Sequence, residues 1–209
     1  MSKKIKENLP LIILLFFSFL LRFPFLNYPS EVVFDEVHYG KYVNAYFPQK
    51  YYFDNHPPLA KMLVAGTAKI LGYSPDSDFD HIGKTLSPKN LFDLRFLPAL
   101  FGTFFPLIIY LLLIEMGLAK NTAFFGAFLV VFDNSLLTQS KFLLMDIFLI
   151  FFGFLSIYLF LKYKKLNQRN DDRSYILLAF SLIFATFAFS VKWTGLLFLG
   201  IISLAILAD

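Results

Sequence analysis

Long apolar stretches recur along this chain and constrain its fold more than any other feature. A helix needs about 20 mainly apolar residues to cross the hydrocarbon core of a membrane, and six stretches reach or approach that length. They cover approximately residues 9–26, 91–116, 122–137, 142–161, 175–191 and 194–208. Charged residues make up 16% of the chain, against about 25% in a soluble domain. The sequence therefore predicts an all-α polytopic membrane protein with about six transmembrane helices.

Basic residues in the short connecting segments predict how these helices are oriented. Lys and Arg concentrate on the cytoplasmic side of membrane proteins. Three basic segments fall on one side if each stretch crosses once, namely residues 3–6, Lys120 and residues 162–173. The long loop over residues 27–90 then faces the periplasm, the cell exterior or the lumen of the endoplasmic reticulum. The first apolar stretch has no small-residue cleavage site after it, so we interpret it as an uncleaved span.

The overall charge and the lack of cysteine exclude several functions. The formal net charge is +4, and the basic residues border apolar stretches, so we expect no nucleic-acid partner. The chain has no Cys, which excludes disulfides, thiolate metal sites and a cysteine nucleophile. Its abundance of Phe, Ile, Lys and Asn favours a prokaryotic plasma membrane, with the endoplasmic reticulum as the location for a eukaryotic protein.

The long outer loop concentrates ionisable residues beside the membrane. Asp35 and Glu36 are adjacent, and Asp54 and His56 follow in a second cluster, with His38 between them. Ionisable groups near hydrocarbon are costly and usually belong to a functional site. Adjacent side chains in an extended loop point in opposite directions. We therefore predict that Asp35 is a general base and that Glu36 holds the loop or the acceptor in place.

Three alternatives for this loop remain open at the level of sequence. Asp35 and Glu36 can instead solvate a surface loop or cap a short helix. The two histidines can be structural hydrogen-bond partners. A divalent metal can be held by Asp35, Asp54 and His56, because carboxylate and imidazole suit Mg, Mn or Zn, although their spacing matches no compact metal motif. Residues 58–73 are expected to form a helix along the membrane surface.

Three cations near the predicted outer face are candidates for binding a phosphate. They are Arg22, Arg95 and Lys192, and an arginine fork suits phosphate oxygens. The alternatives are that Arg22 extends to the interface, that Arg95 pairs with Asp93, and that Lys192 is an interfacial anchor. Further polar residues fall at the same face and are predicted to support the site: Asp133, Gln139, Asp146 and Trp193. Carboxylates beside a phosphate at this face predict transfer of a sugar from a lipid-linked donor.

Five motifs in order and spacing resemble the protein O-mannosyltransferases. They are FDEVHYG from Phe34, FDNHPPLAK from Phe53, RFLPALFG from Arg95, DNSLLTQSK from Asp133 and SVKWTGL from Ser190. The resemblance implies a GT-C class glycosyltransferase that moves mannose from dolichyl or polyprenyl phosphate mannose to Ser or Thr hydroxyls with inversion. It implies that Asp35 is the catalytic aspartate, Glu36 its acidic partner and Arg95 a phosphate ligand. Arg22 matches a further arginine of the first span.

The resemblance also sets expectations about partners and length. The expected partners are membrane lipids, the lipid-linked donor and an acceptor protein, with a dimer left open and no other cofactor required. Members of the family have more spans than these 209 residues supply, so we expect the N-terminal part of a longer transferase. One alternative is a related transferase with a lipid acceptor, such as one adding aminoarabinose to lipid A. A transporter is disfavoured, because the charges gather at one face.

Overall fold

The computed structural model describes residues 3–75 and 78–208, with side chains from residue 8 onward. Residues 76 and 77 of the predicted outer loop and residue 209 lie outside this description. Within the described ranges the chain is almost entirely helical, and an antiparallel bridge between Glu31 and Thr85 is the β-structure present. The predicted all-α fold is confirmed for this part of the chain.

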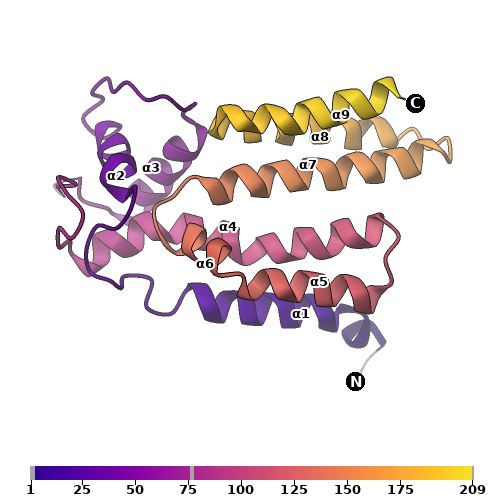
Figure 1. Cartoon of the computed structure of the whole chain (residues 1–209), viewed down its shortest axis with the longest axis horizontal. Coiled ribbons are helices and arrows are strands. Elements are labelled where there is room, and N and C mark those ends of the chain that lie inside the picture. The colour runs from indigo at the N-terminus through magenta and orange to yellow at the C-terminus, as the bar shows by residue number, and fades with distance from the viewer. Residues whose placement is uncertain (1–2, 76–77, 209) are drawn as a thin grey trace.

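The long helices lie roughly side by side (Figure 1). They are α1 (Lys3–Arg22), α4 (Pro88–Glu115), α5 (Lys120–Phe132), α7 (Asp146–Asn167), α8 (Ser174–Val191) and α9 (Leu196–Leu207). By length and composition, α4, α7 and α8 can each cross a membrane. Shorter apolar helices cover 8–22, 120–132 and 193–207. The chain is therefore an integral membrane protein whose described residues contain three full-length candidate spans and three shorter apolar helices.

Several helix boundaries differ from those predicted. The expected span over residues 122–137 breaks at Asp133, which ends α5 and starts the separate helix α6 (Asn134–Lys141). The Asp133 carboxylate accepts a hydrogen bond from the Leu136 N–H at 2.8 Å, as an N-cap residue does. The expected span from residue 142 begins at Asp146 instead and continues to Asn167. A short 3₁₀ turn, η1 (Trp193–Gly195), precedes α9.

Helix α4 is the central element of the bundle. Ser87 caps its N-terminus by accepting from the Asn90 N–H at 3.2 Å, and Pro88 occupies the first turn, where proline costs no hydrogen bond. The helix packs against α1, α3, α5, α6 and α7. A Cβ on Gly102 would lie 2.2 Å from the Ser140 Cβ, so glycine is required for α6 to approach α4 this closely.

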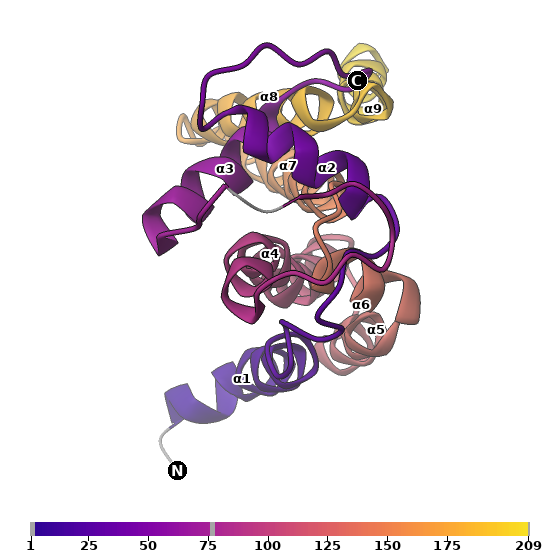
Figure 2. The same cartoon turned by 90° about the vertical axis from the view of Figure 1, so that its left-hand side faces the viewer.

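The predicted outer loop folds into two helices that cross one end of the bundle (Figure 2). These are α2 (Glu36–Ala45) and α3 (Leu59–Leu71), and the second agrees with the surface helix expected at 58–73. Val43 of α2 and Val64 of α3 belong to one buried apolar cluster with Leu91 and Leu94 of α4. A backbone hydrogen bond joins the two ends of this loop: the Val32 N–H donates to the Lys84 carbonyl at 2.9 Å.

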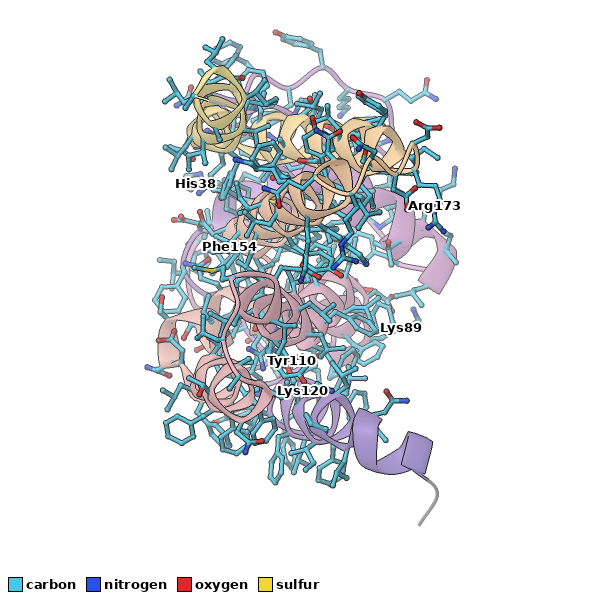
Figure 3. All side chains as sticks on the ribbon, turned by 90° about the vertical axis from the view of Figure 1, so that its right-hand side faces the viewer. His38, Lys89, Tyr110, Lys120, Phe154 and Arg173 are labelled. Atoms are coloured by element: carbon cyan, nitrogen blue, oxygen red, sulfur yellow. The ribbon has the colours of Figure 1, made fainter. Side chains whose placement is uncertain are left out.

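The two ends of the bundle therefore differ in what they carry. The end with α2 and α3 also holds α6, the start of α7 and η1, so the elements bearing the predicted site residues meet there (Figure 1). The other end holds the turns between α4 and α5 and between α7 and α8. Lys120 and Arg173 lie at that second end (Figure 3).

Candidate active site

The acidic pair begins α2, and its two carboxylates have different surroundings. Asp35 precedes the helix with φ −72° and ψ 0°, and its side chain makes no capping hydrogen bond. Asp35 is exposed, whereas Glu36 is 1% exposed. Phe34, just before them, has φ +50°, a left-handed conformation that is uncommon outside glycine. The pair is therefore not in the extended loop assumed from the sequence, although its side chains do diverge.

Glu36 accepts hydrogen bonds from three separate segments. Its carboxylate receives both Nε and Nη2 of Arg95 at 2.8 Å. It also receives the backbone N–H of Val33 at 3.0 Å and of Leu143 at 2.8 Å. One buried carboxylate thus joins the start of α2 to α4 and to the turn before α7.

Arg95 uses every guanidinium N–H within the protein. Besides Glu36, it donates to the carbonyls of Leu26 at 3.3 Å, Pro29 at 3.0 Å and Glu31 at 2.9 Å. The side chain is 0% exposed. A direct contact with a donor phosphate, as predicted, does not agree with this geometry, because no N–H remains available. The alternative partner Asp93 pairs with Lys89 instead.

Arg22 is also fully buried and is therefore not at the interface or in an open site. Its Nε donates to the Ser140 hydroxyl at 3.0 Å and its Nη1 to the Ser18 hydroxyl at 2.9 Å. Its Nη2 is buried without a hydrogen-bond partner among the described residues. These contacts hold α1 against α6, and they differ from the phosphate contact predicted for Arg22.

Beside Asp35 lies a cavity of about 580 Å³. We call it the Asp35 cavity, and its polar lining is Asp35, His38, His81, Thr138, Gln139 and Asp146. The predicted residues Asp35, His38, Gln139 and Asp146 are thus brought together from α2, α6 and α7. Lys192 reaches its edge, where Nζ donates to the Asp146 carboxylate at 2.7 Å.

Two electrostatic effects accompany this cavity. Burial and the charges of Asp146 and Asp35 raise the pKa of Tyr39 to about 12, so its hydroxyl stays protonated. Burial and the nearby charge of Arg95 lower the pKa of Lys141. The carboxylates of the cavity therefore raise the pKa of a tyrosine on the buried face of α2. The charge of Arg95 lowers the pKa of a lysine at the end of α6.

Sequence reasoning missed His81 and Thr138. His81 is separated from Asp35 by 46 positions, and the bridge between residues 31 and 85 returns its loop to α2. That pairing leaves no local signal in the sequence. Thr138 lies inside the DNSLLTQSK motif, one residue before Gln139, so the motif itself was the available signal.

Asp54 and His56 line a different cavity from Asp35, so the three residues of the alternative metal site do not share one cavity. Asp54 pairs with Lys61 and accepts from the His56 backbone N–H at 3.2 Å. Asp35 lines the first cavity and not this one. Among the side chains described, those of residues 8–75 and 78–208, no group of three or more His, Asp or Glu residues could hold a metal ion.

Two further predicted residues have structural contacts in place of cavity contacts. Asp133 is exposed and caps α6. Trp193 donates from its indole Nε1 to the Asn55 carbonyl at 2.6 Å, which ties the second loop motif to η1. Neither lines the Asp35 cavity.

Comparison with known proteins identifies the family. A family model described as dolichyl-phosphate-mannose-protein mannosyltransferase matches residues 12–208. Protein O-mannosyltransferase 1 of Drosophila melanogaster is 38% identical over 86% of this chain and 20% of its own length. Dolichyl-phosphate-mannose–protein mannosyltransferase 4 of Schizosaccharomyces pombe is 36% identical over 93% of this chain and 25% of its own length.

A solved structure agrees with this match. The protein O-mannosyltransferase Pmt1-Pmt2 complex of S. cerevisiae, bound to the sugar donor, contains a chain with a TM-score of 0.91 and 34% identity, over 99% of this chain and 28% of that one. The predicted GT-C fold is confirmed. The chain spans about a fifth to a quarter of the curated relatives' length. These proteins come from a fly and two yeasts, which gives the predicted prokaryotic plasma membrane no support. The chain belongs to the dolichyl-phosphate-mannose-protein mannosyltransferase family.

Proposed function

We propose that the protein containing this chain transfers mannose from a dolichyl or polyprenyl phosphate donor to Ser or Thr hydroxyls of proteins. The observation that carries the proposal is the division within the acidic pair. Glu36 is buried and fully hydrogen-bonded, whereas Asp35 is exposed at a cavity large enough for a sugar. Family membership supports the donor and the reaction, since relatives are named for them.

In this mechanism Asp35 is the general base. Its carboxylate takes the proton from the acceptor hydroxyl, and that oxygen bonds to the anomeric carbon of mannose. The bond from that carbon to the lipid phosphate oxygen breaks, and the phosphate leaves with the electron pair. Attack from the side opposite the phosphate inverts the anomeric centre.

Glu36 and Arg95 position the base in this proposal. Their paired hydrogen bonds fix the first turn of α2 against α4, and Asp35 is the residue immediately before that turn. A base held in place by buried neighbours loses little entropy when the hydroxyl arrives. We therefore assign Arg95 to positioning in place of phosphate binding.

Lys192 is our choice for the phosphate contact among the three predicted cations. It is 17% exposed and contacts Asp146 at the Asp35 cavity, whereas Arg22 and Arg95 are fully buried. A cation at that edge stabilises the charge of the leaving phosphate. Asp146 would keep the ammonium group oriented.

The positions of the basic segments indicate how the protein is oriented in the membrane. The basic segments at residues 120 and 162–173 lie at the end opposite α2 and α3. Because such segments favour the cytoplasmic side, we assign the cavity to the periplasmic, extracellular or lumenal side of the membrane. The named Pmt1-Pmt2 complex supports assembly of the full-length protein with a related chain.

The test uses membranes that contain the full-length protein, radiolabelled dolichyl phosphate mannose and a Ser/Thr-rich peptide. We expect wild type to label the peptide, with and without EDTA, and Asp35→Asn to reduce the rate at least about 100-fold. The matched control is Asp172→Asn, which changes an exposed aspartate at the other end. Equal rates in wild type and Asp35→Asn would contradict the assignment, and label in the lipid fraction alone would indicate a lipid acceptor.

A further inference from the structure

A second cavity, of about 370 Å³, lies between α2 and the start of α3. We call it the tyrosine cavity, and its lining includes Tyr42, Tyr46, Tyr51, Tyr52, His56 and Lys61. It shares α2 with the Asp35 cavity but no lining residue. The mechanism above makes no use of it.

Exposed aromatic rings dominate its wall. Tyr51 is 88% exposed, Tyr52 is 50% and Tyr46 is 41%. The Tyr42 and Tyr52 rings meet edge to face with centroids 4.6 Å apart, so the wall is ordered by its own contacts. A cluster of exposed aromatic rings outside the long apolar helices is typical of an interaction surface. Tyrosine-rich surfaces bind extended polypeptide well, since they offer large rigid faces.

Two polar residues that line this cavity, His56 and Lys61, carry groups shielded from solvent. His56 Nδ1 is buried and has no hydrogen-bond partner among the described residues, although the residue lines the cavity. Lys61 is 3% exposed, and its Nζ donates to the His56 carbonyl at 3.0 Å. Burial lowers the pKa of Lys61 to about 8. An unpartnered ring nitrogen can bond a peptide N–H or carbonyl, according to its tautomer.

Helix α2 connects the two cavities through one face. Asp35, His38 and Tyr42 are spaced by three and four residues, so they lie on the same side of the helix. The adjoining side, with Glu36, Tyr39 and Val43, is buried. Asp35 and Tyr42 are seven residues apart, which is about 10 Å along a helix axis. An extended peptide covers that distance in about three residues.

We propose that the tyrosine cavity binds an extended segment of the acceptor polypeptide, about three residues from the hydroxyl that receives the sugar. The proposal rests on the function proposed above, and it adds a binding site for the acceptor. An apolar or proline side chain of the acceptor packs among the tyrosine rings, and its backbone bonds His56. Two adjacent residues connect the two cavities. Lys192 donates to the Asp146 carboxylate of the Asp35 cavity, and Trp193 donates to the Asn55 carbonyl beside the tyrosine cavity.

The first test is photo-crosslinking, which needs no transfer reaction. The full-length protein in membranes receives a seven-residue peptide with a central Thr and a photoreactive phenylalanine analogue three residues to one side; a second peptide carries it on the other side. We expect one of the two peptides to crosslink within residues 42–61, and Tyr51→Ala to lower its yield. Crosslinks that fall elsewhere for both peptides would overturn the proposal, even if transfer were normal.

The second test separates binding from chemistry. We expect Tyr51→Ala and Tyr52→Ala to raise KM for the seven-residue peptide about three- to tenfold with kcat and the donor KM unchanged. Shortening the peptide on the crosslinked side should remove the difference from wild type. The control is Tyr175→Ala, an exposed tyrosine at the other end.

The outcomes distinguish this site from the proposed function. A raised donor KM with an unchanged peptide KM would indicate a lipid headgroup in the cavity and overturn the proposal. A crosslink within residues 42–61 in a protein that transfers no mannose would support the peptide site and contradict the transferase assignment.

Discussion

Both ends of the helical bundle carry ion pairs, but the pairs differ in how far water reaches them. At the end with α2 and α3, the side chains of Arg95 and Glu36 are 0% and 1% exposed. At the other end, those of Arg173 and Asp171 are 81% and 25% exposed. Buried charges are costly unless every partner is present, whereas exposed pairs contribute little. Of these two pairs, the buried one lies beside the candidate site, and the exposed one lies at the end that carries the basic segments.

Removing one charge of the central buried pair has the largest expected effect. Glu36→Gln leaves the Arg95 guanidinium without a carboxylate and turns an amide N–H toward groups that donate. We expect a loss of about 3–5 kcal/mol of unfolding free energy, measured as a lower thermal midpoint in detergent. The matched control is Glu31→Gln, an exposed carboxylate in the same loop. An unchanged midpoint for Glu36→Gln would remove the structural role given to the pair.

The ion pair at the tyrosine cavity should have a smaller effect. Lys61→Met leaves Asp54, which is 13% exposed, without its cation and opens the contact to the His56 carbonyl. We expect about 2–3 kcal/mol of destabilisation, less than for Glu36 because water reaches Asp54 more easily. Lys69→Met, on the exposed side of α3, serves as the control. A larger loss than that of Glu36→Gln would reverse the order of the two pairs.

The N-cap of α6 tests whether the Asp133 carboxylate has a structural role or takes part in the reaction. Asp133→Ala removes the bond from the Leu136 N–H and should cost about 1 kcal/mol, with faster hydrogen exchange confined to α6. Asn134→Ala, the next exposed side chain, should change neither quantity. Loss of transfer activity without a change in hydrogen exchange would indicate that Asp133 takes part in the reaction.

The exposed pair at the other end should have the smallest effect. Arg173→Ala removes a pair that water already screens, so we expect a thermal midpoint equal to that of wild type within error. The same variant tests orientation, because fewer basic residues near α8 should weaken the cytoplasmic bias measured by accessibility of introduced cysteines. A fall in the thermal midpoint comparable to that of Lys61→Met would contradict the claim that the exposed pair contributes little to stability.

Sequence patterns predicted the fold well where apolar length decides it. The boundaries of α4 and α8 lie within three residues of the predicted spans, because long apolar stretches are sufficient to define such helices. The polar residues Asp133, Asn134 and Ser135 interrupt the expected span over residues 122–137, but the sequence did not predict that a separate helix starts there. A short helix at Asp35 and Glu36 was one of the alternatives left open, and α2 agrees with it. The pairing of Glu36 with Arg95, 59 positions away, was not predicted.

The sequence predicted which residues lie together at the candidate site better than it predicted what each of them contacts. Asp35, His38, Gln139 and Asp146 do share one cavity. The residue type alone did not reveal, however, that Arg22 and Arg95 are buried or that every guanidinium N–H of Arg95 is bonded within the protein. Burial depends on the three-dimensional arrangement of α1, α4 and α6. Exposure therefore favours Lys192 for that contact in place of the two arginines.

The most direct test of the central claim compares Asp35→Asn and Glu36→Gln in the same membranes, with both the thermal midpoint and the mannose transfer rate measured. We expect Asp35→Asn to keep the wild-type midpoint and to lose transfer, because the Asp35 carboxylate is exposed. We expect Glu36→Gln to lower the midpoint, because the Glu36 carboxylate is buried between α2 and α4. A stable and inactive Glu36→Gln beside an active Asp35→Asn would contradict the division of roles within the pair.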